Sequence, residues 1–208
     1  PLRRTPRRSR VRAMSNGKDP ISEFIRLFEL AKAKEPNDAT AMTVATAGAD
    51  GAPHARMLLL KEVDQRGFVF YTNRNSPKGL QIAENPRVAL CFHWPTIMYQ
   101  VRVEGPVEFV PDEESDAYYW SRARGSQLGA WASYQSQPLP SRAELVGRYL
   151  QLKLKHAGRR IPRPPHWGGY LLVPQRIEIW KDGHFRLHDR FNYTRTPDGG
   201  WACERLSP

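Results

Sequence analysis

Three charged or titratable side chains near the C-terminal end of the chain are spaced two residues apart: Arg186, His188 and Arg190. The pattern over residues 186–191 predicts a β-strand that follows a tight turn and a first strand ending near Trp180. Because side chains alternate between the faces of a strand, we expect these three side chains on one face. Two guanidiniums around an imidazole suit a planar, anionic ligand. The alternative, favoured for an isolated pattern of this kind, is a solvated strand face with an incidental histidine.

Further groups able to bind an anion lie at the ends of other predicted strands. Arg56 and Lys61 stand at either end of a four-residue apolar strand. The two cations belong either to a solvated strand edge or to a ligand site. Tyr71-Thr72 ends another strand, and Ser76 and Lys78 follow at the start of a predicted helix. Free backbone N–H groups at a helix N-terminus favour a phosphate. The chain contains neither G-x-G-x-x-G nor G-x-x-x-x-G-K-[ST], so a Rossmann turn and a P-loop are excluded.

Tyr118, Arg122 and Ser126 are spaced four residues apart. If one helix continues through them, their side chains stack along one face and form a second phosphate clamp. The alternative is an amphipathic helix with Tyr118 half-buried and Arg122 in solvent. Gly125 favours the clamp because it permits a close approach of the backbone. Further amide, hydroxyl, stacking and charged contacts are expected from Gln100, Gln135, Ser136, Trp180 and Arg190.

The elements that position these residues follow from periodicity and from turn residues. An amphipathic helix is expected from Asp19-Pro20 to about Lys34, and further helices over residues 76–83, 111–122, 126–133 and 141–157. Strands are expected over residues 42–46, 54–63, 68–72, 87–94, 99–110, 169–181, 186–194 and 201–206. Many sequential strands with helices inserted late predict a mainly β, α+β fold. The strands would form a closed or split antiparallel barrel of Greek-key type with flanking helices.

Length and composition are those of a globular protein. The chain has 208 residues, of which 40% are hydrophobic and 25% charged, and no apolar run is long enough to span a membrane. Cys91 and Cys203 have neither disulfide nor metal-ligand spacing, so we expect no metal and a reducing, cytoplasmic location. Residues 19–208 are expected to form a single domain.

The net charge of +11 is unevenly distributed. Residues 1–13 hold six arginines and no acid, so the remainder carries 11 − 6 = +5. We expect residues 1–18 to be a disordered basic tail. Its alternatives are a nucleic-acid arm, an organellar presequence, or, as we prefer, residues upstream of a true start at Met14.

Several segments together resemble the pyridoxamine 5′-phosphate oxidase family. They cover about residues 20–208, keep the order of the family's motifs, and end in a similar C-terminal segment, residues 204–208. The matching segments are R-M-L-L-L-K (56–61), F-Y-T-N (70–73), Q-V-R-V-E-G (100–105), S-R (121–122), S-Q-L-G-A-W (126–131), Q-S (135–136), W-G-G-Y (167–170) and R-L-H-D-R-F (186–191).

The resemblance implies an FMN-binding split barrel that works as a homodimer with FMN at the subunit interface. Such a protein oxidises pyridoxamine or pyridoxine 5′-phosphate to pyridoxal 5′-phosphate, with O2 as acceptor giving H2O2. The FMN contacts implied are Arg56, Met57, Leu58, Leu59, Leu60, Lys61, Tyr71, Thr72, Lys78, Gln100, Gln135, Ser136, Trp180 and Arg190. The substrate contacts implied are Lys61, Tyr118, Arg122, Ser126, Arg186, Leu187 and His188, with Arg186 and His188 over the reacting carbon.

Two features depart from the family pattern. Pro77 stands where the family commonly has an arginine, which implies one phosphate contact fewer and a lower FMN affinity. The segment that covers the substrate in some members has no clear counterpart, and residues 1–13 do not take that role. The alternatives are a split-barrel flavin oxidase acting on another aromatic metabolite, or a non-enzymatic protein that binds pyridoxal phosphate or nucleic acid. Concentration of positive charge in the tail argues against nucleic acid.

Overall fold

The computed structural model describes residues 19–208. The expected basic tail over residues 1–18 lies outside the described residues, and the assignment of residues 19–208 to one domain remains our proposal. None of the helices within residues 19–208 has the length and apolar content needed to cross a membrane.

The described chain forms five α-helices and ten strands. The helices are α1 (Pro20–Lys34), α2 (Pro77–Glu84), α3 (Asp112–Ser121), α4 (Arg124–Ala132) and α5 (Arg142–Lys155). The strands are β1 (Ala41–Ala47), β2 (Pro53–Leu59), β3 (Glu62–Asp64), β4 (Gly67–Asn73), β5 (Arg87–Trp94), β6 (Tyr99–Phe109), β7 (Trp167–Leu172), β8 (Arg176–Lys181), β9 (Asp189–Arg195) and β10 (Trp201–Arg205).

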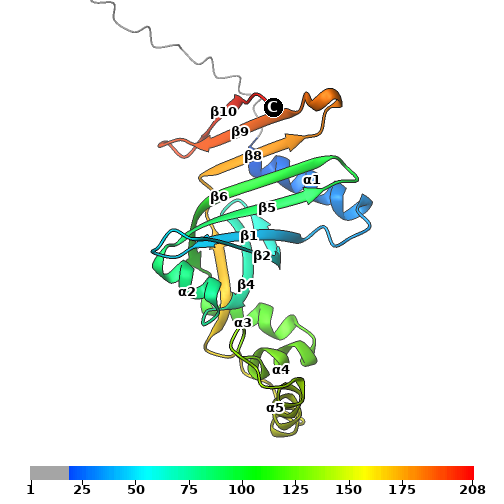
Figure 1. Ribbon diagram of the computed structural model, residues 1–208, viewed down its shortest axis with the longest axis vertical. Helices are drawn as coiled ribbons and strands as arrows, with labels where there is room; N and C mark the ends of the chain where they lie inside the picture. The colour runs from blue at the N-terminus through cyan, green and yellow to red at the C-terminus, as the bar shows by residue number, and fades with distance from the viewer. Residues whose placement is uncertain (1–18) are drawn as a thin grey trace, which may run out of the picture.

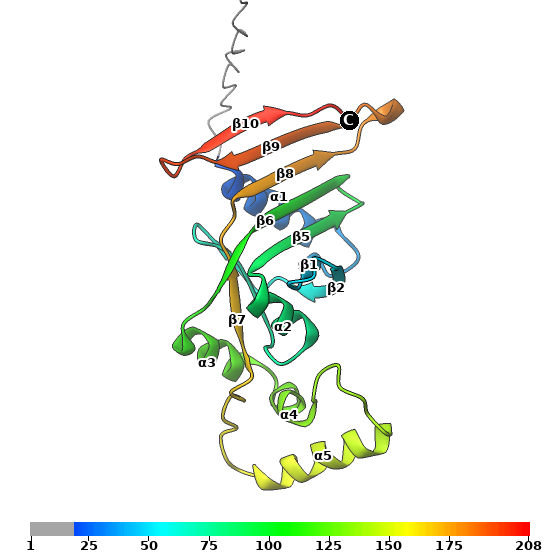
Figure 2. The same cartoon turned by 60° about the vertical axis from the view of Figure 1, so that its left-hand side comes forward.

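All strand pairs are antiparallel, and the long strand β6 joins two parts of the sheet. Up to Pro106 it pairs with β5, and from Val107 it pairs with β7. The change of partner occurs at the predicted bend, where a Cβ on Gly105 would lie 2.1 Å from the carbonyl oxygen of Val173. Figures 1 and 2 show the resulting curled sheet, with β8, β9 and β10 continuing one edge and β4 and β7 turning away. This is a split barrel, as predicted.

The core lies inside the curl and is filled from α1. Phe24 of this helix packs edge-on against Phe68 and Phe92, with ring centroids 4.8 and 4.9 Å apart, and it is fully buried. The helix starts where predicted because the Asp19 carboxylate accepts a hydrogen bond from the Ser22 N–H. Burying one such aromatic side chain contributes about 2 to 3 kcal/mol. The helix therefore anchors the sheet that carries the site.

Two expected strands are each divided in the structure. Residues 54–63 form β2 and β3 because the chain turns at Leu60 and Lys61, whose N–H groups bond to Thr40 and Val69. Residues 169–181 form β7 and β8, with a crossing between the two parts of the sheet at residues 173–175. Hydrophobic alternation does not reveal such a change of hydrogen-bond partner.

The strand predicted over residues 186–194 begins only at Asp189. A short 3-10 turn occupies His184–Arg186, and Phe185 and Arg186 have left-handed backbones with φ of 57° and 63°. Strand alternation needs an extended backbone, so the prediction that Arg186 shares a strand face with His188 and Arg190 is wrong. Arg186 and Leu187 instead lie exposed on a loop between β8 and β9.

Tyr118, Arg122 and Ser126 do not stack along one continuous helix, because two separate helices lie here, close to the predicted ranges 111–122 and 126–133. Helix α3 ends at Ser121, Arg122 has an extended backbone, and α4 starts at Arg124. The Gln127 side chain stabilises the break by donating a 2.8 Å hydrogen bond to the carbonyl of Arg122. A side chain from the second helix thus takes the place of one intrahelical bond.

Candidate active site

The ammonium group of Lys78 is buried at the start of α2 without a negative partner. Its side chain donates to Ser76 Oγ at 3.1 Å and to Gln135 Oε1 at 2.9 Å, and the residue is only 7% exposed. Ser76 occupies the cap position of α2 as expected, but its hydroxyl donates to the carbonyl of Asn73 instead of capping the helix. A buried cation held only by neutral groups lacks a counter-charge, which a bound anion would supply.

A second cation, Arg56 on β2, lies beside it. Its Nη1 donates to the Thr46 hydroxyl at 2.6 Å and its Nη2 to Gln81 Oε1 at 3.3 Å. Thr46 in turn donates to Gln81 at 2.6 Å, so both neutral partners are fixed. Arg56 forms no ion pair with any described residue.

We name the set Arg56, Ser76, Lys78 and Gln135 the anion cradle. Burial, together with the charge of Arg56, lowers the pKa of Lys78 to about 8. The hydroxyl of Thr72, at the end of the neighbouring strand β4, is buried and has no hydrogen-bond partner. Next to the cradle, a cavity of about 280 Å³ is lined by Asn73, Asn75, Tyr134, Gln135, Gln137 and His166. Unpaired charge, an unused hydroxyl and an adjacent cavity fit a phosphorylated ligand.

An aromatic stack connects two of the predicted residue sets. Tyr71, from the cofactor set, stacks on Tyr118, from the substrate set, with ring centroids 4.1 Å apart. Trp167 lies against Tyr71 at 5.2 Å, and the guanidinium carbon of Arg122 lies 4.9 Å from the centre of the Trp167 ring. One nitrogen of Arg122, Nη1, is buried with no hydrogen-bond partner. Tyr118 and Arg122 are therefore brought together even though they do not share one helix.

The stack depends on a glycine. A Cβ on Gly169 would lie 2.7 Å from Tyr71 Cε1 and 2.4 Å from Val110 Cγ2. We expect Gly169→Ala to destabilise the protein by about 1 to 3 kcal/mol and to displace Tyr71. Urea unfolding measures the first effect and tyrosine fluorescence the second. Gly129→Ala is the matched control, because a Cβ there meets nothing within 4 Å. Equal stability of the two variants would contradict this packing.

A second cluster lies on the β8–β9 hairpin, with Trp180 on β8. The His188 ring packs on Trp180 at 4.6 Å, and its Nδ1 is 3.0 Å from a carboxylate oxygen of Asp182. Arg190 on β9 is paired with Trp180 in register, and Gln100 on β6 is paired with Trp180 on its other side. We name Gln100, Trp180, His188 and Arg190 the hairpin cluster.

The anion cradle and the hairpin cluster are separate in one chain. No hydrogen bond, ion pair or ring contact joins them within the described range 19–208. In both views the hairpin loop lies toward one end of the molecule, and α3 and α4 toward the other (Figures 1 and 2).

The remaining predicted residues join neither cluster through a side-chain bond. Lys61, Ser126, Ser136, Met57 and Leu59 are exposed, while Leu58 is half-buried and Leu60 is buried in the core. Alternation along β2 explains this, because Arg56, Leu58 and Leu60 face inward.

Known proteins match nearly the whole described chain. A family model described as pyridoxamine 5′-phosphate oxidase matches residues 30–156, and one described as the pyridoxine 5′-phosphate oxidase C-terminal dimerisation region matches residues 167–208. The chain belongs to the pyridoxamine 5′-phosphate oxidase family. A pyridoxine/pyridoxamine 5′-phosphate oxidase of Myxococcus xanthus is 56% identical over 91% of this chain and 92% of its own. One from Brucella anthropi is 50% identical over 94% of this chain and 100% of its own.

Solved structures agree with the family's fold. PhzG from Burkholderia lata 383, crystallised with tetrahydrophenazine-1-carboxylic acid, has a TM-score of 0.85 at 28% identity, covering 91% of this chain and 93% of its own. An FMN-binding protein of Nostoc punctiforme, described as pyridoxamine 5′-phosphate oxidase-related, has a TM-score of 0.75 at 18% identity over 92% of this chain and 98% of its own. The protein is thus a split-barrel oxidoreductase of the pyridoxamine 5′-phosphate oxidase family.

Four partners of the predicted residues were not identified from the sequence: Thr46, Gln81, Glu178 and Asp182. Thr46 and Gln81 hold Arg56, and Glu178 pairs with Arg190 at 2.9 Å. These contacts join residues distant in the chain, so no local spacing indicates them. Asp182 is different, because a carboxylate in the turn before a nearby histidine was a visible signal.

Proposed function

We propose that this protein uses FMN to oxidise pyridoxamine 5′-phosphate and pyridoxine 5′-phosphate to pyridoxal 5′-phosphate, with O2 as acceptor giving H2O2. The observation that carries this proposal is the contact between Tyr71 and Tyr118. It brings a residue expected at the cofactor into van der Waals contact with one expected at the substrate phosphate. The high identity of the curated relatives supports the same substrates.

The anion cradle fits the phosphate of FMN. Lys78 and Arg56 supply two positive charges that no described carboxylate neutralises, and Thr72 supplies a hydroxyl without a partner. Pro77 removes the arginine that the family commonly has there, and the guanidinium of Arg74 does not replace it, because it lies over the Phe109 ring. The cradle therefore relies on Lys78 and Arg56.

FMN held by the anion cradle and Arg190 would supply the two-electron redox chemistry, with O2 as the final acceptor. The protein binds the cofactor and the substrate and orients them toward each other. Arg122, Tyr118, Lys61 and Ser126 would hold the substrate phosphate, which together with the cradle fixes the distance between the reactants. Such positioning can contribute at most about 7 to 11 kcal/mol.

Arg186 and His188 would position the reacting carbon of the substrate. His188 Nδ1 accepts a 3.2 Å hydrogen bond from the Gly183 N–H and lies 3.0 Å from a carboxylate oxygen of Asp182, which fixes the position of the ring. Asp182 also receives the Gly183 N–H at 3.0 Å, which fixes its carboxylate beside the ring. We assign His188 to substrate positioning first and to proton removal second.

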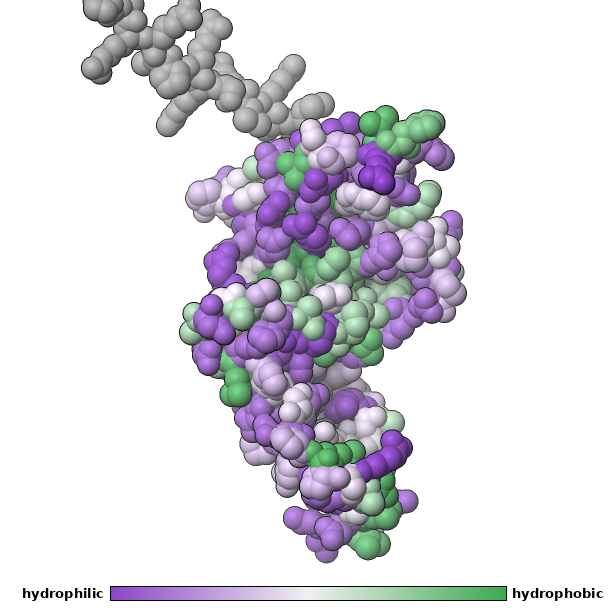
Figure 3. Space-filling model, viewed as in Figure 1, coloured by the Kyte–Doolittle hydropathy of each residue, from purple (hydrophilic) through white to green (hydrophobic). Residues whose placement is uncertain are grey.

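We further propose a homodimer with FMN between the subunits. Support comes from the division of the cofactor residues into the cradle and the hairpin cluster, which one chain keeps apart. Apolar residues are also exposed next to the hairpin cluster: Phe185 is 94% and Leu187 73% exposed. Figure 3 shows apolar surface at this loop, at the upper right, and over α5 at the lower end. A second copy would cover the loop and complete the site.

We also propose a reducing, cytoplasmic location, which fits the two free cysteines, Cys91 and Cys203. A related oxidation of another aromatic metabolite is the second candidate, because the Burkholderia neighbour was crystallised with a tetrahydrophenazine carboxylic acid.

The test is the absorption spectrum of the purified full chain, before and after FMN addition, followed by peroxide release. We expect a flavin spectrum, and peroxide with pyridoxamine or pyridoxine 5′-phosphate but far less with unphosphorylated pyridoxamine. Absence of a flavin spectrum after FMN addition would overturn the proposal. Oxidation of a tetrahydrophenazine carboxylic acid, with none of the phosphorylated vitamers, would favour the second candidate.

A further inference from the structure

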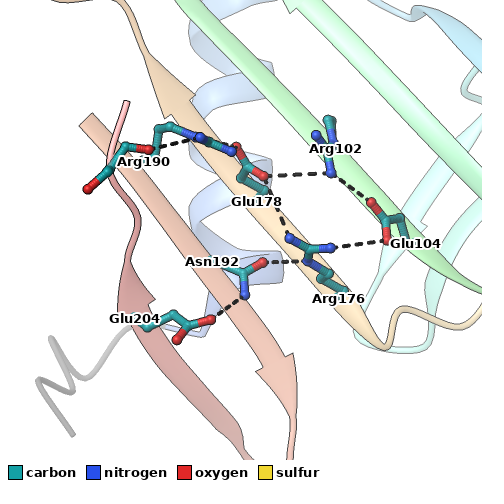
Figure 4. A network of polar contacts seen from close by, with 8 residues as sticks. Arg102, Glu104, Arg176, Glu178, Arg190, Asn192 and Glu204 are labelled. Atoms are coloured by element: carbon teal, nitrogen blue, oxygen red, sulfur yellow. Dashed lines mark hydrogen bonds and ion pairs between the residues drawn. The ribbon is translucent and has the colours of Figure 1, made fainter. Parts of the chain in front are cut away.

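A buried carboxylate, Glu178 on β8, lies at the centre of a polar network on the sheet (Figure 4). The residue is 3% exposed. Its Oε1 accepts a hydrogen bond from Nε of Arg190 at 2.9 Å and lies 2.9 Å from Nη2 of the same guanidinium in an ion pair. Its Oε2 lies 3.7 Å from Arg102 and 4.0 Å from Arg176, beyond hydrogen-bond reach. Glu178 therefore directs its two short contacts to Arg190.

Arg190 is held from its other side by the last residues of the chain. Its Nη1 donates to the carbonyl of Ser207 at 2.9 Å, and its own carbonyl accepts from the Leu206 N–H at 3.0 Å. Two N–H groups of the guanidinium thus donate hydrogen bonds, one from Nε and one from Nη1, while Nη2 lies in the ion pair with Glu178. Because the planar guanidinium is fixed at two edges, the orientation of its remaining donors is fixed as well.

A neighbouring carboxylate provides an internal comparison. Glu104 on β6 bonds to Arg102 at 2.9 Å and lies 3.7 Å from Arg176, but it has no contact with Arg190. It thus belongs to the same network, but it is more exposed than Glu178 and has no contact with Arg190. Asn192 and Glu204 complete the network from β9 and β10.

We propose that Glu178 is a positioning residue for the cofactor: together with the carbonyl of Ser207 it holds Arg190 so that the remaining N–H groups of its guanidinium bind FMN. This inference rests on the proposed function, since it needs Arg190 to contact FMN. It adds a role for a carboxylate that would itself repel the anionic cofactor. Glu178 acts only through Arg190.

The test measures FMN binding to the apoprotein by quenching of flavin fluorescence. Glu178→Gln keeps the size of the side chain but removes its charge, and we expect it to raise the Kd for FMN about tenfold, because the guanidinium loses its ion pair and keeps only a weaker contact with a neutral amide. Glu104→Gln should change the Kd less than about twofold. In an Arg190→Ala background, Glu178→Gln should add nothing. The last result separates positioning from a general effect on the fold.

A second variant covers the case in which Glu178→Gln does not fold, judged by circular dichroism. Deleting Ser207 and Pro208 removes the other hold on Arg190 and should raise the Kd several-fold. The inference fails if wild-type protein binds FMN while the folded Glu178→Gln variant binds equally well. It also fails if Glu178→Gln weakens binding equally with and without Arg190. If only the deletion variant folds, the inference fails when the deletion leaves the Kd for FMN unchanged. Failure of wild-type protein to bind FMN would instead overturn the proposed function.

Discussion

Replacing Lys78 with methionine is expected to weaken FMN binding by about 100-fold while making the FMN-free protein more stable. A charge-assisted contact of a buried ammonium with a phosphate contributes about 1.5 to 3 kcal/mol, which corresponds to that loss of affinity. Without the phosphate, the same ammonium is buried beside Arg56 with only neutral partners. Methionine has a similar length and no charge, so the apoprotein should gain about 1 to 3 kcal/mol.

The gain in stability should depend on pH in a defined direction. The pKa of Lys78 is lowered to about 8 by burial and by Arg56, below its ordinary value of 10.5. Between these values the unfolded chain binds the proton and the folded chain has released it, so wild-type stability rises with pH. Below pH 8 the buried ammonium is charged in the folded chain, so its full destabilising effect on folding is present. The advantage of Lys78→Met should thus be largest at pH 7 and shrink toward pH 10.

Urea unfolding of the apoproteins at pH 7, 8, 9 and 10 measures this advantage, and FMN titration measures the affinity. Lys153→Met, on the exposed face of α5, is the control and should change neither quantity. A Lys78→Met apoprotein that is less stable than wild type at pH 7 would contradict the uncompensated charge. Unchanged FMN affinity would remove Lys78 from the cofactor site.

Replacing Arg186 with alanine is expected to lower kcat/KM for pyridoxamine 5′-phosphate by about 100-fold and to leave FMN content unchanged. Arg186 is exposed, and within residues 19–208 its side chain has no hydrogen bond or ion pair. The fold therefore does not depend on its guanidinium. Loss of one charged contact with the reacting substrate costs about 2 to 4 kcal/mol, which is the expected decrease in rate.

Steady-state peroxide release and the flavin absorbance of the purified variant test this prediction together. Arg195→Ala is the matched control, since it removes an arginine at the far end of β9, where the side chain lies over Trp201. It should retain wild-type kcat/KM. If Arg186→Ala loses flavin and activity in equal proportion, Arg186 belongs to the cofactor site or the fold rather than to substrate positioning.

Local patterns predicted elements well where capping residues or alternation of apolar side chains decide them. The helix at Pro20–Lys34 and the strand at Arg87–Trp94 were predicted closely, because capping residues and alternation act over a few positions. The strand predicted at Arg186 was wrong, and the break at Arg122 excludes a stack of Tyr118, Arg122 and Ser126 on one helix, because long-range contacts set the backbone at both places. Gln127 holds the break after α3. In the hairpin loop, the Asp182 N–H bonds to the Met98 carbonyl from another strand connection.

The sequence by itself determined the mainly β split barrel, the family resemblance and the types of residue able to hold two phosphates, because motif order and periodicity are properties of the chain. Only the tertiary structure decided which of these residues meet. It placed Lys78 against Gln135, Tyr71 against Tyr118, and Arg190 between Glu178 and Ser207. It also separated the anion cradle from the hairpin cluster. The physical reason is that burial and charge compensation depend on neighbours brought in from distant parts of the chain.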